Sequence, residues 1–311
     1  MIAVPAGLRE SSAQAFGEEG VKWCATLPDL VAEYSERWKL TLDLSEGAEP
    51  WFGFCGIVVP VRTPSGEPAV LKISWPDDDT AHEHLALAAW AGNRAVRLLA
   101  ADGPRRALLL ERLDADRDLR SLPVDGAIRV LVDLLVGLAE QSAPAVIDTQ
   151  EDLAARWIEQ LPRRWREVGP PYPEAMLNRA VDIARDLGPG SGGRLIHTDL
   201  HYENVLASLP EKAATRGEWL AIDPKPVAGD PEFGVLPLLW NRLEELDPAD
   251  PAADLRRRMR LAAEVGGLDI NLVRDWSIAR LVETVIWDSE IGAGDGDHHP
   301  GWIVEALTGG S

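Results

Sequence analysis

Asp199, Asn204 and Asp223 are of the residue types that phosphoryl transfer requires at its centre. They lie in two short motifs, HTDLHYEN at 197–204 and LAID at 220–223. Transfer to a hydroxyl needs one carboxylate to accept the proton, and oxygen ligands that hold Mg²⁺ against the phosphates of ATP. We therefore expect Asp199 to be catalytic and Asn204 and Asp223 to bind the metal. An isolated HxD would be interpreted as a polar turn, but the spacing to Asn204 and Asp223 argues against that here.

Short apolar runs flank these motifs and predict the strands that position them. The expected strands are 194–196, 205–207 and 219–222, with a polar turn at 208–218. Pro224 and Pro226 predict that strand pairing ends after Asp223, because proline cannot donate to a ladder. His197 is expected to brace the loop by hydrogen bonding rather than to transfer protons, and no role is assigned to His201 or Glu203.

A lysine on an apolar strand is the candidate for the nucleotide side of the reaction. Lys72 alternates with core-type residues in the run PAVLKISW at 68–75, which forms a hairpin with the strand predicted at 57–62. Such a lysine can extend to solvent. The helix predicted next, at about 77–91, carries Glu83, which could pair with Lys72 and orient it toward the α- and β-phosphates of ATP.

Two further segments are weaker candidates for contacts with ATP. WFGFCG at 51–56 contains two glycines where a fuller glycine-rich loop would cover the phosphates, and a plain hairpin turn explains it equally well. A second hairpin is predicted from 96–99 and 107–111. It ends near Glu111 and Leu113, whose backbone groups are expected to pair with adenine.

The composition excludes several classes of function. With 46% hydrophobic and 26% charged residues, the chain is typical of soluble globular proteins, and no apolar run reaches the roughly 18 residues of a membrane span. No secretory signal is evident, which predicts a cytoplasmic location. The 51 acidic and 31 basic residues give a net charge of −20, which disfavours nucleic acid and anionic membranes as partners. A cationic small-molecule acceptor would be attracted, although acidity also serves solubility alone. Cys24 and Cys55 match no metal or redox spacing.

A chain of 311 residues is long enough for two lobes. We expect an α+β fold with a β-rich nucleotide-binding lobe at 1–111 and a mostly helical catalytic and acceptor-binding lobe at 112–311. Apolar positions recur at helical spacing in the second lobe. They predict helices at 124–141, 151–166, 173–187, 231–246, 252–265 and 271–290.

At these motifs the chain resembles the aminoglycoside and hydroxyurea phosphotransferases, and within them it is most similar to the streptomycin 6-phosphotransferases. The resemblance spans nearly the whole chain and is carried by GEEG at 17–20, AVLK at 69–72, LLERL at 109–113, HYENVL at 201–206, WLAIDP at 219–224 and GDP at 229–231. It implies a two-lobed protein-kinase-like fold, ATP and Mg²⁺ as cofactors, and O-phosphorylation of a small antibiotic. The chain departs from the family at Gly234, where relatives commonly have an aspartate that orients the following helix.

Carboxylates of the second lobe could bind a guanidinium-bearing acceptor through charge-assisted hydrogen bonds. The candidates are Asp230, Glu232, Glu283, Asp288 and Glu290. The last three are separated by five and two residues on one predicted helix, so they cannot all face one pocket. Two other activities remain open: a kinase of hydroxyurea or another small acceptor, and an inactive nucleotide-binding sensor. Asp and His residues at 292–299 suggest a surface loop more than a metal site.

Overall fold

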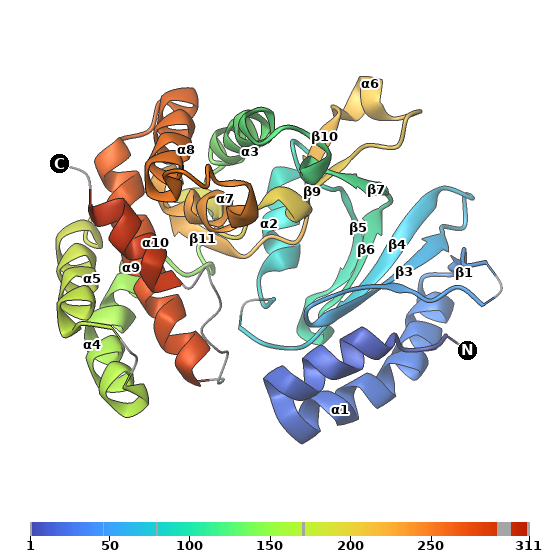
Figure 1. Ribbon diagram of the computed structural model, residues 1–311. Helices are drawn as coiled ribbons and strands as arrows, with labels where there is room; N and C mark the ends of the chain where they lie inside the picture. The colour runs from blue at the N-terminus through green and yellow to red at the C-terminus, as the bar shows by residue number, and fades with distance from the viewer. Residues whose placement is uncertain (1, 46, 79, 170–171, 291–299, 310–311) are drawn as a thin grey trace. The chain divides into compact units, whose positions relative to one another are not determined.

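The computed structural model describes residues 2–45, 47–78, 80–169, 172–290 and 300–309 (Figure 1). The chain divides into two compact units, which we describe separately. The first comprises Met1–Asp114 and Ser208–Glu218, and the second Ala115–Ala207 and Trp219–Ser311. The division therefore falls at residue 114, against the expected 111. The sequence did not anticipate that segment 208–218 belongs to the first unit.

An antiparallel sheet forms the centre of the first unit. Its strand order is β1-β3-β4-β6-β5, and β2 also pairs with β3. The strands are β1 (Thr41–Leu42), β2 (Trp51–Gly53), β3 (Gly56–Arg62), β4 (Pro68–Ser74), β5 (Leu98–Asp102) and β6 (Ala107–Glu111). Both predicted hairpins are present, β3 with β4 and β5 with β6. Lys72 lies on β4, with neighbouring strands on both sides.

A helical segment that was not predicted from the sequence, made of two helices joined at a kink at Gly17, covers one face of this sheet. Helix α1 (Ala6–Arg37) packs against β3 and β4 (Figure 1). Its apolar residues, including Leu8, Leu27 and Tyr34, are buried with Val59 and Leu71 in one core cluster. Each such large side chain contributes about 1.5–3 kcal/mol by leaving water.

Helix α2 (Glu83–Trp90) begins later than expected. The acidic residues before it were predicted to start the helix, but the Asp77 carboxylate accepts hydrogen bonds from the backbone N–H and hydroxyl of Thr80. Asp77 thus stabilises a turn, because a short carboxylate side chain competes for nearby backbone donors. The helix consequently has Glu83 in its first turn, and it ends at Ala91 in the left-handed conformation.

The segment 208–218 is attached to the rest of the first unit mainly through Arg216, and Lys212 adds an ion pair with Glu67 at 3.0 Å. Arg216, at the end of α6 (Ala213–Arg216), forms a buried ion pair with Glu111 at 2.5 Å and donates to the carbonyls of Gly92 and Ala95. The Glu111 carboxylate also accepts from the backbone N–H of Arg97. These contacts explain why an insertion far along the sequence packs with residues of the N-terminal sheet.

The second unit is mostly helical, with two small sheets. Its helices are α3 (Val124–Leu138), α4 (Gln150–Val168), α5 (Glu174–Leu187), α7 (Leu236–Trp240), α8 (Pro251–Gly266), α9 (Ile270–Glu290) and α10 (Pro300–Thr308). The strands are β7 (Asp114–Asp118), β8 (Arg194–His197), β9 (Val205–Ala207), β10 (Trp219–Ala221) and β11 (Pro226–Gly229). Its single-turn 3₁₀ segments are η2 (Leu119–Ser121), η3 (Tyr202–Asn204), η4 (Pro231–Gly234) and η5 (Leu243–Glu245), while η1 (Gly103–Arg105) lies in the first unit. The helix expected at 231–246 is thus broken into η4, α7 and η5.

The prediction that pairing ends after Asp223 was wrong. Strand β11 starts at Pro226 and pairs antiparallel with β8, while β9 pairs with β10. Proline is tolerated there because it is the first residue of the strand. A short connection that contains Asp223 and Lys225 joins β10 to β11. Within the described residues, no helix is long and apolar enough to cross a bilayer.

Candidate active site

A completely buried histidine holds the HTDLHYEN loop in place. His197, the last residue of β8, accepts a hydrogen bond at Nδ1 from the backbone N–H of Asp199 (3.1 Å). Its Nε2 lies 2.9 Å from the carbonyl oxygen of Ile222. With Nδ1 as an acceptor, Nε2 must carry the proton. The ring therefore links the residue before Asp223 to Asp199, which is a bracing role.

The backbone of Ile222 connects the segments that carry the two candidate metal ligands, Asn204 and Asp223. The Ile222 backbone N–H donates to the carbonyl of Asn204 (2.9 Å), and its carbonyl accepts from His197. The side-chain amide of Asn204 donates to the backbone carbonyl of Asp199 (2.8 Å), so its Oδ1 remains as an acceptor. Asp223 follows directly, in the left-handed conformation with a φ of 54°. All three sequence-predicted residues are thus brought to one loop cluster.

The residue types of this cluster fit a magnesium ion that is shared with a nucleotide. Among the described residues, no group of three or more His, Cys, Asp or Glu side chains could ligate a metal alone. Mg²⁺ is commonly held by one or two protein oxygens together with substrate phosphates and water. Asn204 Oδ1 and the Asp223 carboxylate match that ligand set.

Asp199 has a basic partner that the sequence analysis did not identify. Lys225 Nζ lies 3.2 Å from Asp199 Oδ2, and their side chains are 46% and 22% exposed. The lysine is brought there by pairing: the Thr198 backbone N–H and hydroxyl both donate to the Lys225 carbonyl. The ion pair therefore places a positive charge directly beside the Asp199 carboxylate.

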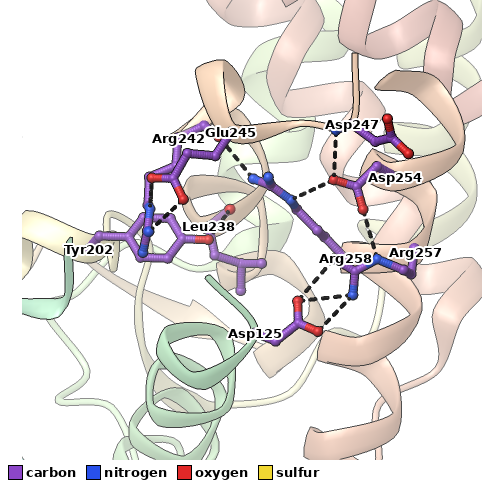
Figure 2. Close-up of polar contacts among 9 residues, drawn as sticks. All are labelled: Asp125, Tyr202, Leu238, Arg242, Glu245, Asp247, Asp254, Arg257 and Arg258. Atoms are coloured by element: carbon purple, nitrogen blue, oxygen red, sulfur yellow. Dashed lines mark hydrogen bonds and ion pairs between the residues drawn. The ribbon is translucent and has the colours of Figure 1, made fainter. Parts of the chain in front are cut away.

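A polar network supports the loop from behind (Figure 2). The Tyr202 hydroxyl donates to the carbonyl of Leu238, and the Arg242 guanidinium lies 5.0 Å from the centre of the Tyr202 ring. Arg242 is held by Glu245 at 2.7 Å, and its own carbonyl accepts from the fully buried Arg258. Tyr202, which lies between Asp199 and Asn204 in the chain, is thus anchored to Leu238 and Arg242.

A pocket of about 410 Å³ opens beside the catalytic candidate. Asp199, His201 and Glu203 lie on one side, Trp240 and Asn241 come from the end of α7, and the remaining lining residues are Thr284, Asp288, Pro300 and Ile303. Thr284 and Asp288 are one turn apart on α9 and so share a face. An acidic pocket with an aromatic wall is suited to a cationic ligand. The sequence pointed to Asp288 but not to Trp240, Asn241, Thr284 or Ile303.

The other acidic candidates are not in this lining. Asp230 accepts from the backbone N–H of Gly192, and Glu232 from that of Asp269. Glu283 and Glu290 both pair with Arg164, at 3.1 and 2.8 Å. The helical spacing explains the difference, since Glu283 and Asp288 are five residues apart and lie on different faces of α9. The segment 292–299 lies outside the described residues.

In the first unit, Lys72 and Glu83 form a buried ion pair. Lys72 Nζ lies 2.7 and 2.8 Å from the two carboxylate oxygens of Glu83, and the residues are 8% and 2% exposed. Glu83 reaches the lysine because α2 begins directly at this residue. This is the pairing that the sequence suggested, and it fixes the ammonium group at one position on β4.

The two weaker candidates for contacts with ATP are the Glu111–Leu113 backbone and the WFGFCG segment. The Glu111 side chain is committed to Arg216 and its backbone N–H to the Arg97 carbonyl, whereas Leu113 is buried. Adenine recognition by backbone groups at Glu111 and Leu113 stays a prediction. The WFGFCG segment forms the β2–β3 hairpin, in which Gly53 pairs with Gly56. Its Phe52 and Phe54 side chains are about half exposed.

Comparison with known proteins identifies the family of this chain. The model of the aminoglycoside/hydroxyurea antibiotic resistance kinase family matches residues 37–292. The chain belongs to this family. It is 38% identical to the streptomycin 6-kinase of Streptomyces glaucescens, over 99% of this chain and 98% of that protein. It is 35% identical to the hydroxyurea phosphotransferase of Kitasatospora aureofaciens, over 94% of this chain and 82% of that protein.

Among solved structures, the fold of this family member matches the macrolide 2′-phosphotransferase of Brachybacterium faecium. The TM-score is 0.54 at 17% identity, covering 91% of this chain and 99% of that one. The fold is therefore that of the kinase-like phosphotransferases, α+β with a β-rich first lobe and a mostly helical second lobe. As a member of the family that matches residues 37–292, the chain is a small-molecule kinase that acts on hydroxyl groups, as the sequence predicted.

Gly234, where the resemblance predicted a departure from the family, lies in a tightly packed position. A Cβ atom at this position would lie 2.7 Å from Leu135 Cδ1 and 2.9 Å from Ile196 Cγ2. Both neighbours belong to the buried core around β8. Segment η4 thus packs directly onto the strand that ends at His197, so any side chain at position 234 would require its neighbours to shift.

The bracing role of His197 predicts a specific pH dependence of the kinase's stability. Burial lowers the pKa of His197 from 6.5 to about 4, although its hydrogen bond to Ile222 and the charges of Asp199 and Asp223 oppose this. The unfolded chain therefore binds this proton at a higher pH than the folded chain does. Burial of the neutral ring contributes about 3 kcal/mol to the free energy of unfolding. This contribution is complete above pH 6.5 and is lost as the pH falls toward 4.

Urea unfolding of the wild type and His197→Gln at pH 7, 5.5 and 4.5 measures this effect. We expect the difference in unfolding free energy between the two proteins to shrink steadily as the pH falls, because other titrating groups cancel in the comparison. A difference that stays constant over this range would mean that the histidine is not buried in its neutral form.

Proposed function

We propose that this kinase transfers the γ-phosphoryl group of ATP, with Mg²⁺, to a hydroxyl of a cationic aminocyclitol antibiotic of the streptomycin type. The observation that carries the proposal is the position of Asp199 on the wall of a pocket that also contains Asp288 and Trp240. The identity to streptomycin 6-kinases over nearly the full length supports it. We assign the reaction to the cytoplasm, where ATP is available.

Each candidate residue has a role that its geometry supports. Asp199 orients the acceptor hydroxyl and accepts its proton, assisted by the fixed loop around it. Asn204 Oδ1 and Asp223 would hold Mg²⁺, and the ion would supply positive charge to neutralise the phosphates of ATP. Lys72, oriented by Glu83, binds the ATP phosphates. In this reaction a bond forms between the acceptor oxygen and the γ-phosphorus. The bond between the γ-phosphorus and the oxygen that bridges it to the β-phosphate breaks, and ADP leaves.

The acceptor pocket favours a polar cationic ligand of drug size. Its volume of about 410 Å³ lies within the range of small-molecule sites. The carboxylate of Asp288 offers a charge-assisted hydrogen bond to a guanidinium group, and Trp240 offers an apolar surface for the cyclitol or sugar ring. Hydroxyurea is the second candidate acceptor, because a relative at 35% identity is a hydroxyurea phosphotransferase. Hydroxyurea is neutral and far smaller than an aminocyclitol antibiotic, so its binding would gain little free energy from the Asp288 carboxylate.

ATP consumption with Mg²⁺ should be measured against streptomycin, other aminoglycosides, macrolides, hydroxyurea and simple amino alcohols. We expect turnover with streptomycin and a KM for it that rises about tenfold or more in Asp288→Asn, since a hydrogen bond between charged groups contributes about 1.5–3 kcal/mol. Glu283→Gln is the matched control, because Glu283 is on the same helix but pairs with Arg164. Its KM should change little.

The other outcomes distinguish the alternatives. Turnover with hydroxyurea alone, insensitive to Asp288→Asn, would make the chain a kinase of that acceptor. Tight ATP binding without turnover on any acceptor would contradict the proposal and favour a nucleotide sensor.

A further inference from the structure

Arginines from three helices converge on a second cavity of the helical unit. The cavity has a volume of about 320 Å³ and is lined by Arg179 of α5, Arg256 and Arg260 of α8, and Asn271 and Arg274 of α9. It shares no lining residue with the pocket beside Asp199. Four guanidinium groups line this one cavity, although the chain has a net charge of −20 and its acidic residues outnumber its basic ones.

Helix α8 separates its arginines into two sets. Arg257 pairs with Asp125 and Asp254, and the buried Arg258 contacts Asp254 and donates to the Arg242 carbonyl (Figure 2). These two have acidic partners. Arg256 and Arg260 lie one turn apart on the face that lines the cavity. Their like charges disfavour the helix by about 0.2–0.5 kcal/mol unless an anion offsets them.

The arginines around the cavity keep a net positive charge when their contacts with carboxylates are counted. Arg274 pairs with Asp275, which also lies 3.6 Å from Arg179, and Asp269 is close enough to Arg274 to act on its charge. Two carboxylates therefore offset part of the charge of four arginines, and neither lines the cavity. The Arg256 guanidinium donates to the Ala306 carbonyl, which is not charged. Among the described residues, Arg260 has no hydrogen-bond or ion-pair partner.

We propose that this cavity binds a small anion that carries phosphate groups. Planar guanidinium groups bind phosphate oxygens through paired hydrogen bonds, and the Asn271 amide supplies a further donor. The volume is at the lower end of that found for small-molecule sites, which suits a compact anion. The inference depends on these residues alone and is independent of the acceptor and of the catalytic assignment.

The site also has a physical connection to the acceptor pocket. Helix α9 supplies Asn271 and Arg274 to the cavity and Thr284 and Asp288 to the pocket, and α10 supplies residues to both. Ten residues separate Arg274 from Thr284, which is roughly 15 Å along a helix. An anion at the cavity would thus contact a helix that carries acceptor-binding groups.

Calorimetric titration of the full chain with inorganic pyrophosphate, at constant ionic strength, tests the proposal. We expect saturable binding to the wild type and a dissociation constant that is weaker by about tenfold or more in Arg260→Glu, because one charged contact is reversed. Arg129→Glu is the matched control. Arg129 is also an exposed residue in the middle of a helix, α3, which contributes nothing to the cavity lining. Its variant should bind as the wild type does.

Several results would overturn the proposal. Absence of saturable binding would do so, as would an unchanged affinity in Arg260→Glu, which would place the pyrophosphate elsewhere, such as at Lys72. Equal weakening in both variants would indicate only a general effect of net charge. Citrate, an anion with carboxylate groups, is titrated in parallel to separate recognition of phosphate from recognition of any anion. A lower dissociation constant for citrate than for pyrophosphate would exclude a phosphate site. Arg260→Gln replaces Arg260→Glu if melting shows that the charge reversal impairs folding.

Discussion

Replacing Asp199 with alanine is expected to lower kcat by about 10²–10⁴-fold, the usual contribution of a positioned general base. The loss should fall on kcat, because the carboxylate acts on the acceptor hydroxyl and not on the nucleotide. The loop should keep its shape, since its anchors are the backbone N–H of Asp199 to His197 and the backbone carbonyl of Asp199 to Asn204. ATP binding, measured by calorimetry, should therefore remain close to that of the wild type.

The control for this prediction is Asp186→Ala, which removes an exposed carboxylate from α5. It should leave kcat, KM and ATP binding unchanged. Wild-type turnover by Asp199→Ala would show that another group accepts the proton. A simultaneous loss of ATP binding and of the folded state would mean that the substitution disturbs the loop, and Asp199→Asn, which preserves the side-chain shape, would then separate the two effects.

The sequence predicted those parts of the site that depend on local spacing. Asp199, Asn204 and Asp223 lie in two short motifs, and hydrogen bonds join Asn204 to Asp199 and to the residue before Asp223. Lys72 and Glu83 are eleven residues apart on adjacent elements, so their pairing was also accessible.

Features that depend on contacts between distant segments were missed. Lys225 reaches Asp199 only because β11 pairs with β8, and the sequence analysis had excluded that strand on account of its proline. The acceptor pocket collects Trp240, Thr284 and Ile303 from α7, α9 and α10, and no periodicity within one helix reveals such a convergence. The acidic residues Glu232 and Glu283 were plausible by charge, but each has a structural partner elsewhere.

Removing the positive charge of Lys72 should affect stability and activity together. Lys72→Met leaves the Glu83 carboxylate, which is 2% exposed, without its cation. Breaking a buried ion pair on one side costs about 3–5 kcal/mol in unfolding free energy, because the remaining charge is uncompensated. If the lysine also binds the ATP phosphates, as we propose, kcat/KM for ATP should fall strongly in the same variant.

A double replacement separates these two consequences. In Lys72→Met/Glu83→Leu no charge is left buried, so the free energy of unfolding should recover most of the loss, as it often does when a buried pair is replaced by apolar residues. Activity should not recover, because no ammonium group is present at β4. Urea unfolding and ATP kinetics on the wild type, the single variant and the double variant measure both effects.

The surface pair of Lys22 and Glu19 provides the comparison. Its side chains are 66% and 71% exposed, so Lys22→Met should change stability by at most about 1 kcal/mol and leave ATP kinetics unaffected. If the double variant at Lys72 and Glu83 regained activity along with stability, the lysine would be a structural residue. A stable but inactive double variant would instead establish that this buried pair is retained for its charge, since the fold itself tolerates an apolar replacement.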